Sequence, residues 1–212
     1  MTVIDQPVAL SKMRRAVVRT VTASAIVPQY SVAIDMPIAA VLAARNSVAE
    51  TGERVSISDI IHAGVVRGLV KHPNVNASFI EEGIIRHSVV NLAFIVEVGD
   101  GMVAPAILDA SAKSVTELAI ERSRLTESAL TGTLKPEELL SGTFTVSNLG
   151  TLGVHRFNAM VLPPQAAILA VGAPNDNGLI SLTLSCDHRV VDGAPAARFL
   201  AEVVQNITEW VS

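Results

Sequence analysis

The sequence predicts an α+β fold in which helices flank a mostly antiparallel or mixed sheet. Helix-like and strand-like segments are mixed along the chain without the strict alternation of parallel α/β folds. Half of the 212 residues are hydrophobic and only 17% are charged, which is enough apolar surface for one large core. No internal repeat, low-complexity tract or Gly/Ser linker divides the chain, so we expect a single domain over residues 1–212.

The first third of the chain is expected to form three helices and a strand. Apolar residues at helical spacing, with Ser11 as cap and Pro28 as stop, predict the first helix. "SVAIDM" alternates like a strand and leads into a short helix over about residues 38–48. The helix over "ISDIIHAGVVRGLVKHP" has Ser58 as its expected N-cap and Pro73 beyond its end.

The rest of the chain continues this mixture. "NASFI", "IIRHSVV" and "NLAFIVEV" are strand-like and are separated by the turns "EEG" and "GDG". Ser114 and Glu117 form a capping box that opens a helix, and Pro136 begins a shorter one. "TFTVS", "AAILAV" and "LISLTLSC" are predicted strands. An amphipathic helix follows, whose apolar stripe ends in Trp210 and Val211.

Composition excludes several classes of protein. The net charge of −4 argues against a general nucleic-acid binder. One cysteine, Cys186, leaves no intrachain disulfide and fits a reducing compartment. With no signal peptide or membrane span apparent, we expect a cytoplasmic protein, or a mitochondrial matrix protein in a eukaryote. His62, His72, His87 and His155 are scattered and expected to be surface or satisfied polar residues, so no metal site is predicted.

Two segments carry candidate catalytic residues. In "LSCDHRVVDGAPAARFL", His188 follows a strand-like run and Asp192-Gly193 opens a helix. A tight turn there would leave one imidazole nitrogen free as a base, while Asp192 caps the helix or pairs with an arginine. In "GTFTVSNLGTLGVHRF", Ser147 ends a strand before glycines, where its hydroxyl can donate to a developing oxyanion. Taken singly, each segment is better explained by an ordinary turn.

Taken together, the two segments closely resemble the catalytic domain of the dihydrolipoamide acyltransferases of 2-oxoacid dehydrogenase complexes. "LSKMRRAVVRTVTASAIVPQYSVAIDM", "NVNASF", "VNLAFIVEVGDGMVAPAILDASAKSVTELA" and "GTLKPEELLSGTF" match the same family in order, so the resemblance covers nearly the whole chain. It implies a chloramphenicol acetyltransferase-like fold with active sites at the subunit interfaces of a homotrimer. Trimers of this family assemble into cubic or dodecahedral cages. The implied reaction moves an acyl group between dihydrolipoamide and coenzyme A.

The resemblance also assigns roles to the candidate residues. His188 is implied as the general base, and Ser147 of a neighbouring subunit as the residue that stabilises the oxyanion. Asp192 orients the loop of His188 more than it transfers a proton. A neutral imidazole suits this chemistry, since a histidine has a pKa of about 6.5 and a free thiol one of about 8.5. A thioester is already activated, so no metal is needed.

Several other residues are candidates for binding coenzyme A or for supporting the site. Coenzyme A carries phosphates, and its candidate cationic partners are Arg14, Arg15 and Arg19, although a solvated helix face explains them equally well. Asn148, next to Ser147, is a further candidate for binding coenzyme A. Arg189 is expected to hold the loop of His188, and Cys186 to be a small core residue instead of a nucleophile.

The sequence also departs from full-length members of the family. A lipoyl domain, flexible linkers and a partner-binding domain are not found, so a separate domain or chain would supply the lipoyl group and the contacts with the dehydrogenase and dihydrolipoamide dehydrogenase components. The stretch "APNDNGLI", residues 173–180, is shorter than the expected hairpin. "LSCDHRVVDG" is closer to the acetyl and branched-chain members than to the succinyl ones.

Two alternative functions stay open. One is a small-molecule acetyltransferase of the same fold, which would act on a hydroxyl or an amine. The other is a catalytically silent scaffold of such a complex, against which the intact His188, Asp192 and Ser147 argue. Neither a nucleic acid nor a membrane is an expected partner. Trp210 is expected to pack in the core, with a knob between trimers as the alternative.

Overall fold

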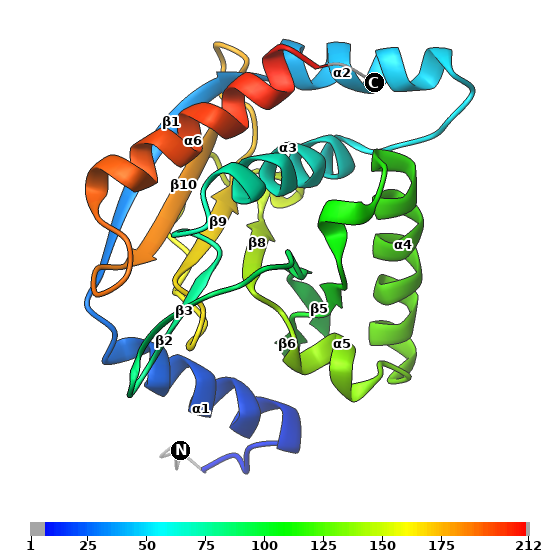
Figure 1. Cartoon of the computed structure of the whole chain (residues 1–212). Helices are drawn as coiled ribbons and strands as arrows, with labels where there is room; N and C mark the ends of the chain where they lie inside the picture. The colour runs from blue at the N-terminus through cyan, green and yellow to red at the C-terminus, as the bar shows by residue number, and fades with distance from the viewer. Residues whose placement is uncertain (1–6, 211–212) are drawn as a thin grey trace, which may run out of the picture.

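A computed structural model describes residues 7–210, in which six strands form a central sheet flanked by helices (Figure 1). The order of the strands across the sheet is β1-β10-β9-β8-β4-β7. These strands are β1 (Gln29–Pro37), β10 (Leu179–Asp187), β9 (Ala167–Val171), β8 (Phe144–Asn148), β4 (Leu92–Phe94) and β7 (Ala106–Ile107).

The sheet is mixed, as the sequence predicts. β10 runs antiparallel to both β1 and β9. β9, β8 and β4 are parallel neighbours, and β7 closes the far edge antiparallel to β4. Two hairpins lie outside this sheet: β2 (Ala77–Ile80) with β3 (Gly83–Arg86), and β5 (Val96–Val98) with β6 (Gly101–Val103). The predicted strand "NLAFIVEV" is therefore two strands, because the chain leaves the sheet at Ile95.

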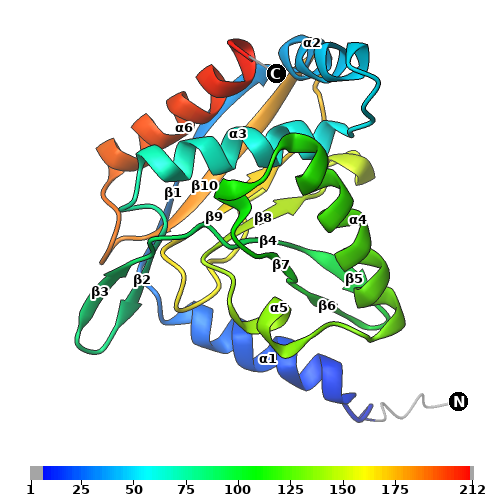
Figure 2. The ribbon, with the colours of Figure 1, turned by 45° about the vertical axis from the view of Figure 1, so that its right-hand side comes forward.

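The helices cover the sheet unevenly (Figure 2). They are α1 (Lys12–Ala25), α2 (Ile38–Glu50), α3 (Ile57–Lys71), α4 (Val115–Thr131), α5 (Pro136–Leu140) and α6 (Gly193–Thr208), with short 3₁₀ turns η1 (Ala110–Ala112) and η2 (Gly150–Leu152). α3 and α6 lie side by side against the sheet, and α4 flanks the β4 end. None of the helices in residues 7–210 is long and apolar enough to cross a membrane.

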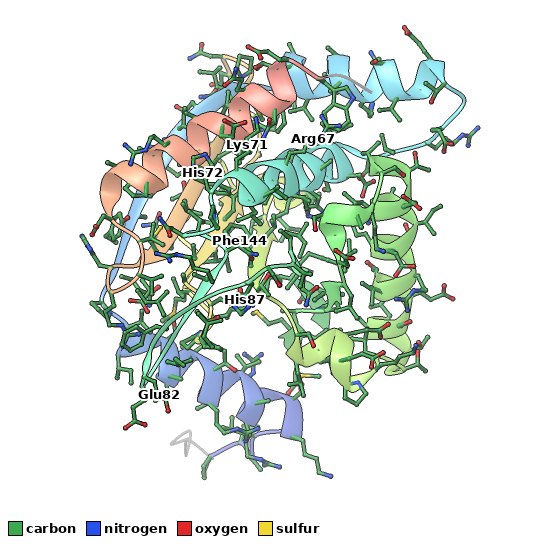
Figure 3. All side chains as sticks on the ribbon, in the orientation of Figure 1. Arg67, Lys71, His72, Glu82, His87 and Phe144 are labelled. Atoms are coloured by element: carbon green, nitrogen blue, oxygen red, sulfur yellow. The ribbon has the colours of Figure 1, made fainter. Side chains whose placement is uncertain are left out.

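The main core lies between the sheet and the α3–α6 pair. Phe144 of β8 (Figure 3) meets Phe199 of α6 edge to face, with ring centroids 5.7 Å apart. α3 approaches α6 closely because Gly68 faces Phe199 and Val203, whose atoms lie 3.1 Å from where a Cβ would be. Trp210 packs against this core, with the Arg67 guanidinium 4.3 Å from its ring centroid, while Val211 lies outside the described residues.

Two sequence-based predictions about α3 are wrong. Ser56, not Ser58, is the N-cap: its hydroxyl accepts from the Asp59 N–H at 3.2 Å, and the Asp59 carboxylate accepts the Ser56 N–H at 2.7 Å. The capping box needs a carboxylate three residues after the cap, and only Ser56 has one. His62 is neither exposed nor satisfied. Its side chain is 4% exposed and its Nδ1 has no hydrogen-bond partner, because it lies on the face of α3 that packs on the sheet.

Candidate active site

The loop that follows β10 carries His188 and is held at three points. The backbone N–H of His188 donates to the carbonyl of Pro28 at 2.9 Å, which ties the loop to the start of β1. Asp187 is 2% exposed and binds Arg189 through two contacts, Nε to Oδ1 at 2.9 Å and Nη2 to Oδ2 at 2.7 Å. The Arg189 guanidinium in turn lies 3.9 Å from the ring centroid of Phe79. Arg189 therefore fixes the loop, as expected from the sequence.

The imidazole of His188 projects from this fixed loop and is 54% exposed. Its ring centroid lies 4.4 Å from that of Tyr30, whose hydroxyl donates to the carbonyl of Val191 at 3.0 Å. Asp192 stands at the N-cap position of α6, but its side chain makes no capping bond; its Oδ1 lies 3.5 Å from Nδ1 of His188 and it is 81% exposed. Neither predicted role of Asp192, a helix cap or an arginine pair, is observed in residues 7–210. Since Nδ1 faces Asp192, Nε2 is the nitrogen left for a reacting group.

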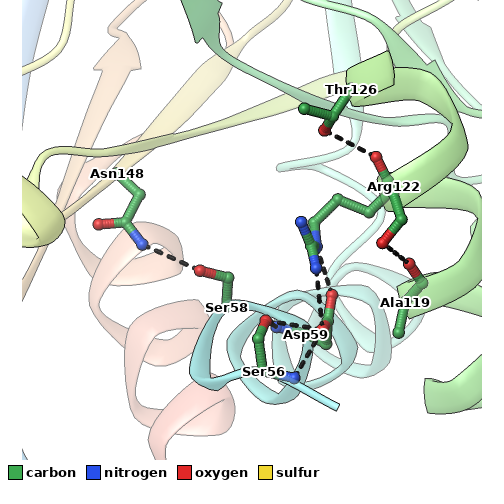
Figure 4. A network of polar contacts seen from close by, with 8 residues as sticks. Ser56, Ser58, Asp59, Ala119, Arg122, Thr126 and Asn148 are labelled. Carbon is green, nitrogen blue, oxygen red and sulfur yellow. Dashed lines mark hydrogen bonds and ion pairs between the residues drawn. The ribbon is translucent and has the colours of Figure 1, made fainter. Parts of the chain in front are cut away.

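Ser147 stands one residue before the end of β8. Its side chain is largely buried, and its hydroxyl makes no hydrogen bond to any other residue in the described part of the chain. Asn148 closes the strand: its Oδ1 accepts from the Gly150 N–H at 2.8 Å and its Nδ2 donates to Ser58 Oγ at 3.2 Å (Figure 4). A Cβ at Gly150 would lie 2.7 Å from the carbonyl oxygen of Gly172, so only glycine fits this turn.

Strand direction places Ser147 and His188 far apart within one chain. Ser147 pairs with Ala170 of β9, which pairs with Thr183 of β10. His188 lies five residues beyond Thr183, which is about 17 Å along the strand, and β8 is separated from β10 by about 10 Å across the sheet. Figure 1 shows that the arrowheads of β8 and β10 point to opposite ends of the sheet. A hydroxyl and an imidazole at this separation within one chain cannot act on the same substrate atom.

Comparison with known proteins shows the family to which the chain belongs. Residues 4–212 match the model of the 2-oxoacid dehydrogenases acyltransferase (catalytic domain) family. The chain belongs to this family. The dihydrolipoyllysine-residue acetyltransferase component of the pyruvate dehydrogenase complex of Rickettsia felis is 36% identical over 191 residues, which cover 82% of this chain and 46% of the relative. The chain thus spans about half the length of the curated relatives it matches.

Solved structures of this family have the same fold. A truncated catalytic core of the 2-oxoacid dehydrogenase complex from Thermoplasma acidophilum matches with a TM-score of 0.90 at 27% identity, covering 98% of this chain and 100% of that one. The cubic core of a pyruvate dehydrogenase complex matches with a TM-score of 0.85 at 26% identity, covering 97% and 92%. A chloramphenicol acetyltransferase, at a TM-score of 0.57 and 11% identity over 92% and 94%, shares the fold alone. The predicted fold class is confirmed.

One solved relative bears on the catalytic residues. The dihydrolipoamide acetyltransferase of Azotobacter vinelandii matches with a TM-score of 0.86 at 26% identity, covering 97% of this chain and 92% of that one. Its structure was used to study the catalytic roles of one serine, one histidine and one asparagine. In that protein the serine precedes the histidine by 52 residues, and the asparagine follows the histidine by four.

The cationic residues predicted to bind coenzyme A lie away from His188 within one chain. Arg14 and Arg15 are in the first turn of α1, where their guanidinium groups donate to the carbonyls of Asp100 and Leu10. From Arg15 to the end of α1 at Ala25 is about 15 Å, and that end lies near the loop of His188. A single subunit therefore does not bring these arginines to His188, and their role stays a prediction.

The one cysteine of this chain is not a reactive group. Cys186 is fully buried in β10, and burial raises the pKa of its thiol to about 12, so the thiol stays protonated at neutral pH. Within residues 7–210 no group of three or more His, Cys, Asp and Glu side chains could hold a metal ion.

Sequence reasoning missed two residues that hold the catalytic loop. Asp187 is the carboxylate that fixes this loop, whereas the sequence pointed to Asp192 for that role. The signal was present, because Asp187 and Arg189 flank His188 with opposite charges. Tyr30 packs on the imidazole, and no local pattern could have found it, since it reaches His188 only through the pairing of β1 with β10.

Proposed function

We propose that this chain is an acyltransferase catalytic domain that moves an acetyl or branched-chain acyl group between dihydrolipoamide and coenzyme A in a 2-oxoacid dehydrogenase complex. One observation carries the proposal. His188 is presented on a braced, half-exposed loop at one end of the sheet, while the unpartnered hydroxyl of Ser147 lies at the other end. Each chain thus supplies one half of two different sites, as an interface active site requires.

The proposed reaction uses both halves. Nε2 of His188 takes the proton of the attacking thiol, and the thiolate adds to the thioester carbonyl. Ser147 of the neighbouring subunit donates a hydrogen bond to the oxyanion, which lowers the barrier by roughly 2.7 to 4 kcal/mol. The bond to the departing sulfur then breaks, and the imidazolium returns its proton to that thiolate. Asp192 and Tyr30 orient the imidazole on either side.

The same arrangement supports assembly into trimers. A cyclic homotrimer repeats one heterologous interface three times, so each interface joins a His188 to a Ser147 of the next chain. We propose that trimers build a larger cage, supported by the match to a cubic core. The lipoyl group and the dehydrogenase and dihydrolipoamide dehydrogenase partners would come through a separate domain or chain. Coenzyme A is a substrate here, with Asn148, Arg14 and Arg15 proposed as its contacts.

Two departures from the Azotobacter relative concern this site. Asp192 stands four residues after His188, where that relative has an asparagine. Ser147 precedes His188 by 41 residues instead of 52, in keeping with a shortened hairpin at residues 173–180. The structure supports a compact turn there, since Asn175 Oδ1 accepts from the N–H groups of Asn177 and Leu179 at 3.0 Å. The His188 and Ser147 environments do not involve this turn.

The proposal is tested by acyl transfer to dihydrolipoamide from acetyl-CoA and isobutyryl-CoA. His188→Ala should lower turnover about 10²- to 10⁴-fold, as expected for loss of a general base. His155→Ala is the control for loss of an exposed histidine, and it should keep wild-type turnover. Turnover only with a hydroxyl or amine acceptor would favour a small-molecule acetyltransferase. An assembled wild-type protein without any turnover would favour the scaffold.

A further inference from the structure

A cavity of about 160 Å³ lies on the face of β8 opposite the Ser147 side chain. It extends between the end of β8, the first turns of α3 and the middle of α4. Its walls are Ser58, His62, Phe94, Ile95, Arg122, Thr126, Val146, Asn148 and Thr151. A single water needs only about 10 to 15 Å³, so the cavity has room for a small organic ligand.

One charged side chain lines this cavity, and its partner carboxylate lies behind it. Arg122 is the only charged residue in its walls. Asp59 holds the inner edge of that guanidinium, with Nε to Oδ1 at 2.5 Å and Nη2 to Oδ2 at 3.2 Å, but Asp59 does not line the cavity (Figure 4). The Asp59 charge is further stabilised by the N–H and hydroxyl of Ser56 at 2.7 and 2.6 Å. Nη1 of Arg122 has no partner among residues 7–210, which leaves its donors for a ligand.

Two more hydrogen-bonding groups are available. His62 lines the cavity and is 96% buried, yet its Nδ1 has no hydrogen-bond partner. Burial lowers the pKa of His62 to about 4, so the ring is neutral at pH 7 and one of its nitrogens is a donor. Ser58 Oγ accepts from Asn148, and its own proton is committed to no described residue. A buried polar group without a partner is costly, so the unpaired ring nitrogen of His62 favours a bound partner.

We propose that this cavity is a binding site for a short-chain carboxylate. The carboxylate accepts hydrogen bonds from Arg122, Ser58 and His62. The short hydrocarbon tail packs against Phe94, Ile95 and Val146, the apolar part of the wall. A carboxylate is favoured over a neutral amide because the Arg122 guanidinium lines the cavity and no Asp or Glu side chain does. The site is separate from the His188 chemistry and does not depend on the proposed function.

The test is calorimetric titration of the assembled protein with propionate and with its neutral isostere propionamide, at pH 7.5 and constant ionic strength. Propionate should bind saturably, and propionamide at least about tenfold more weakly. Arg122→Gln should weaken propionate binding by about tenfold or more. Arg124→Gln is the matched control, since Arg124 lies two residues further along α4, pairs with Glu121 and Glu138, and does not line the cavity. It should bind propionate like the wild type.

His62→Phe provides a second variant that keeps the Arg122–Asp59 pair intact. It removes the ring nitrogens and fills space in the cavity, so it should also weaken propionate binding by about tenfold. If Arg122→Gln fails to assemble, this variant decides, and unchanged affinity in it would overturn the proposal. Equal binding of propionate and propionamide, or no saturable binding of propionate up to about 50 mM, would overturn it as well. These outcomes are read without any acyl transfer, so they are independent of turnover.

Discussion

Coexpression of Ser147→Ala chains with His188→Ala chains should restore activity that neither variant has alone. The register of the sheet puts the two side chains about 17 Å apart along the strands and about 10 Å across them. The proposed active site therefore takes His188 from one chain and Ser147 from another. In a mixed trimer, a site is intact where the first chain carries only the Ser147 change and the second only the His188 change.

The size of the recovery follows from the symmetry of the ring. With equal amounts of the two variants and random assembly, each neighbour has an even chance of being either one, so about a quarter of the interfaces are intact. Turnover with dihydrolipoamide should then reach about a quarter of the wild-type value. Each variant assembled alone should be reduced about 10²-fold or more.

The assay compares coassembled chains with the same two variants assembled separately and mixed just before measurement. The separately assembled mixture is the control, because subunits that do not exchange form no hybrid interface. Recovery in the coassembled sample only supports a shared site. Equal, low turnover in both samples, with mixed trimers verified by mass, would refute the reasoning from strand register and place both residues in one chain's site.

Three further predictions concern the supporting structure. Asp187→Asn should lower turnover about a hundredfold, because it releases the loop of His188. In the same assay Asp192→Asn should lower turnover less than about tenfold, since the Asp192 side chain is exposed and its Oδ1 lies 3.5 Å from Nδ1 of His188. His62 is charged below about pH 6.5 in the unfolded chain but only below about 4 when folded, so the free energy of unfolding should fall by up to about 3 kcal/mol as the pH drops through that window. Denaturant titrations should show this loss in the wild type and not in His62→Leu; equal pH dependence would contradict it. Gly172→Ala would place a Cβ 2.0 Å from the carbonyl oxygen of His155, so thermal unfolding should occur at least several degrees lower, and an unchanged midpoint would contradict the packing.

Local patterns determined most of the secondary structure. Ser11 caps α1, the Ser114 and Glu117 box opens α4, and Pro136 begins α5, all as predicted. These signals act over three or four residues, so they are complete in the sequence itself. The same holds for His188 at the end of a strand and Ser147 near the end of another. The order of family motifs was also sufficient to assign the fold.

Tertiary structure decided which residues surround the candidate catalytic groups. Asp187, not Asp192, braces the His188 loop, because burial and the position of Arg189 favour the nearer carboxylate. His62 is buried beside Arg122, whereas the sequence predicted a surface or satisfied polar residue. Such contacts join segments tens of residues apart, and their geometry depends on how α3 and α4 pack on the sheet.

The separation of Ser147 from His188 is the clearest case. The sequence determined that each residue stands near the end of its own strand. It did not determine at which end of the sheet each of these strands finishes. That depends on the antiparallel pairing of β10 with β9 and the parallel pairing of β9 with β8. Strand direction is set by the long-range connections of the whole chain, and it places the two halves of one proposed site on different subunits.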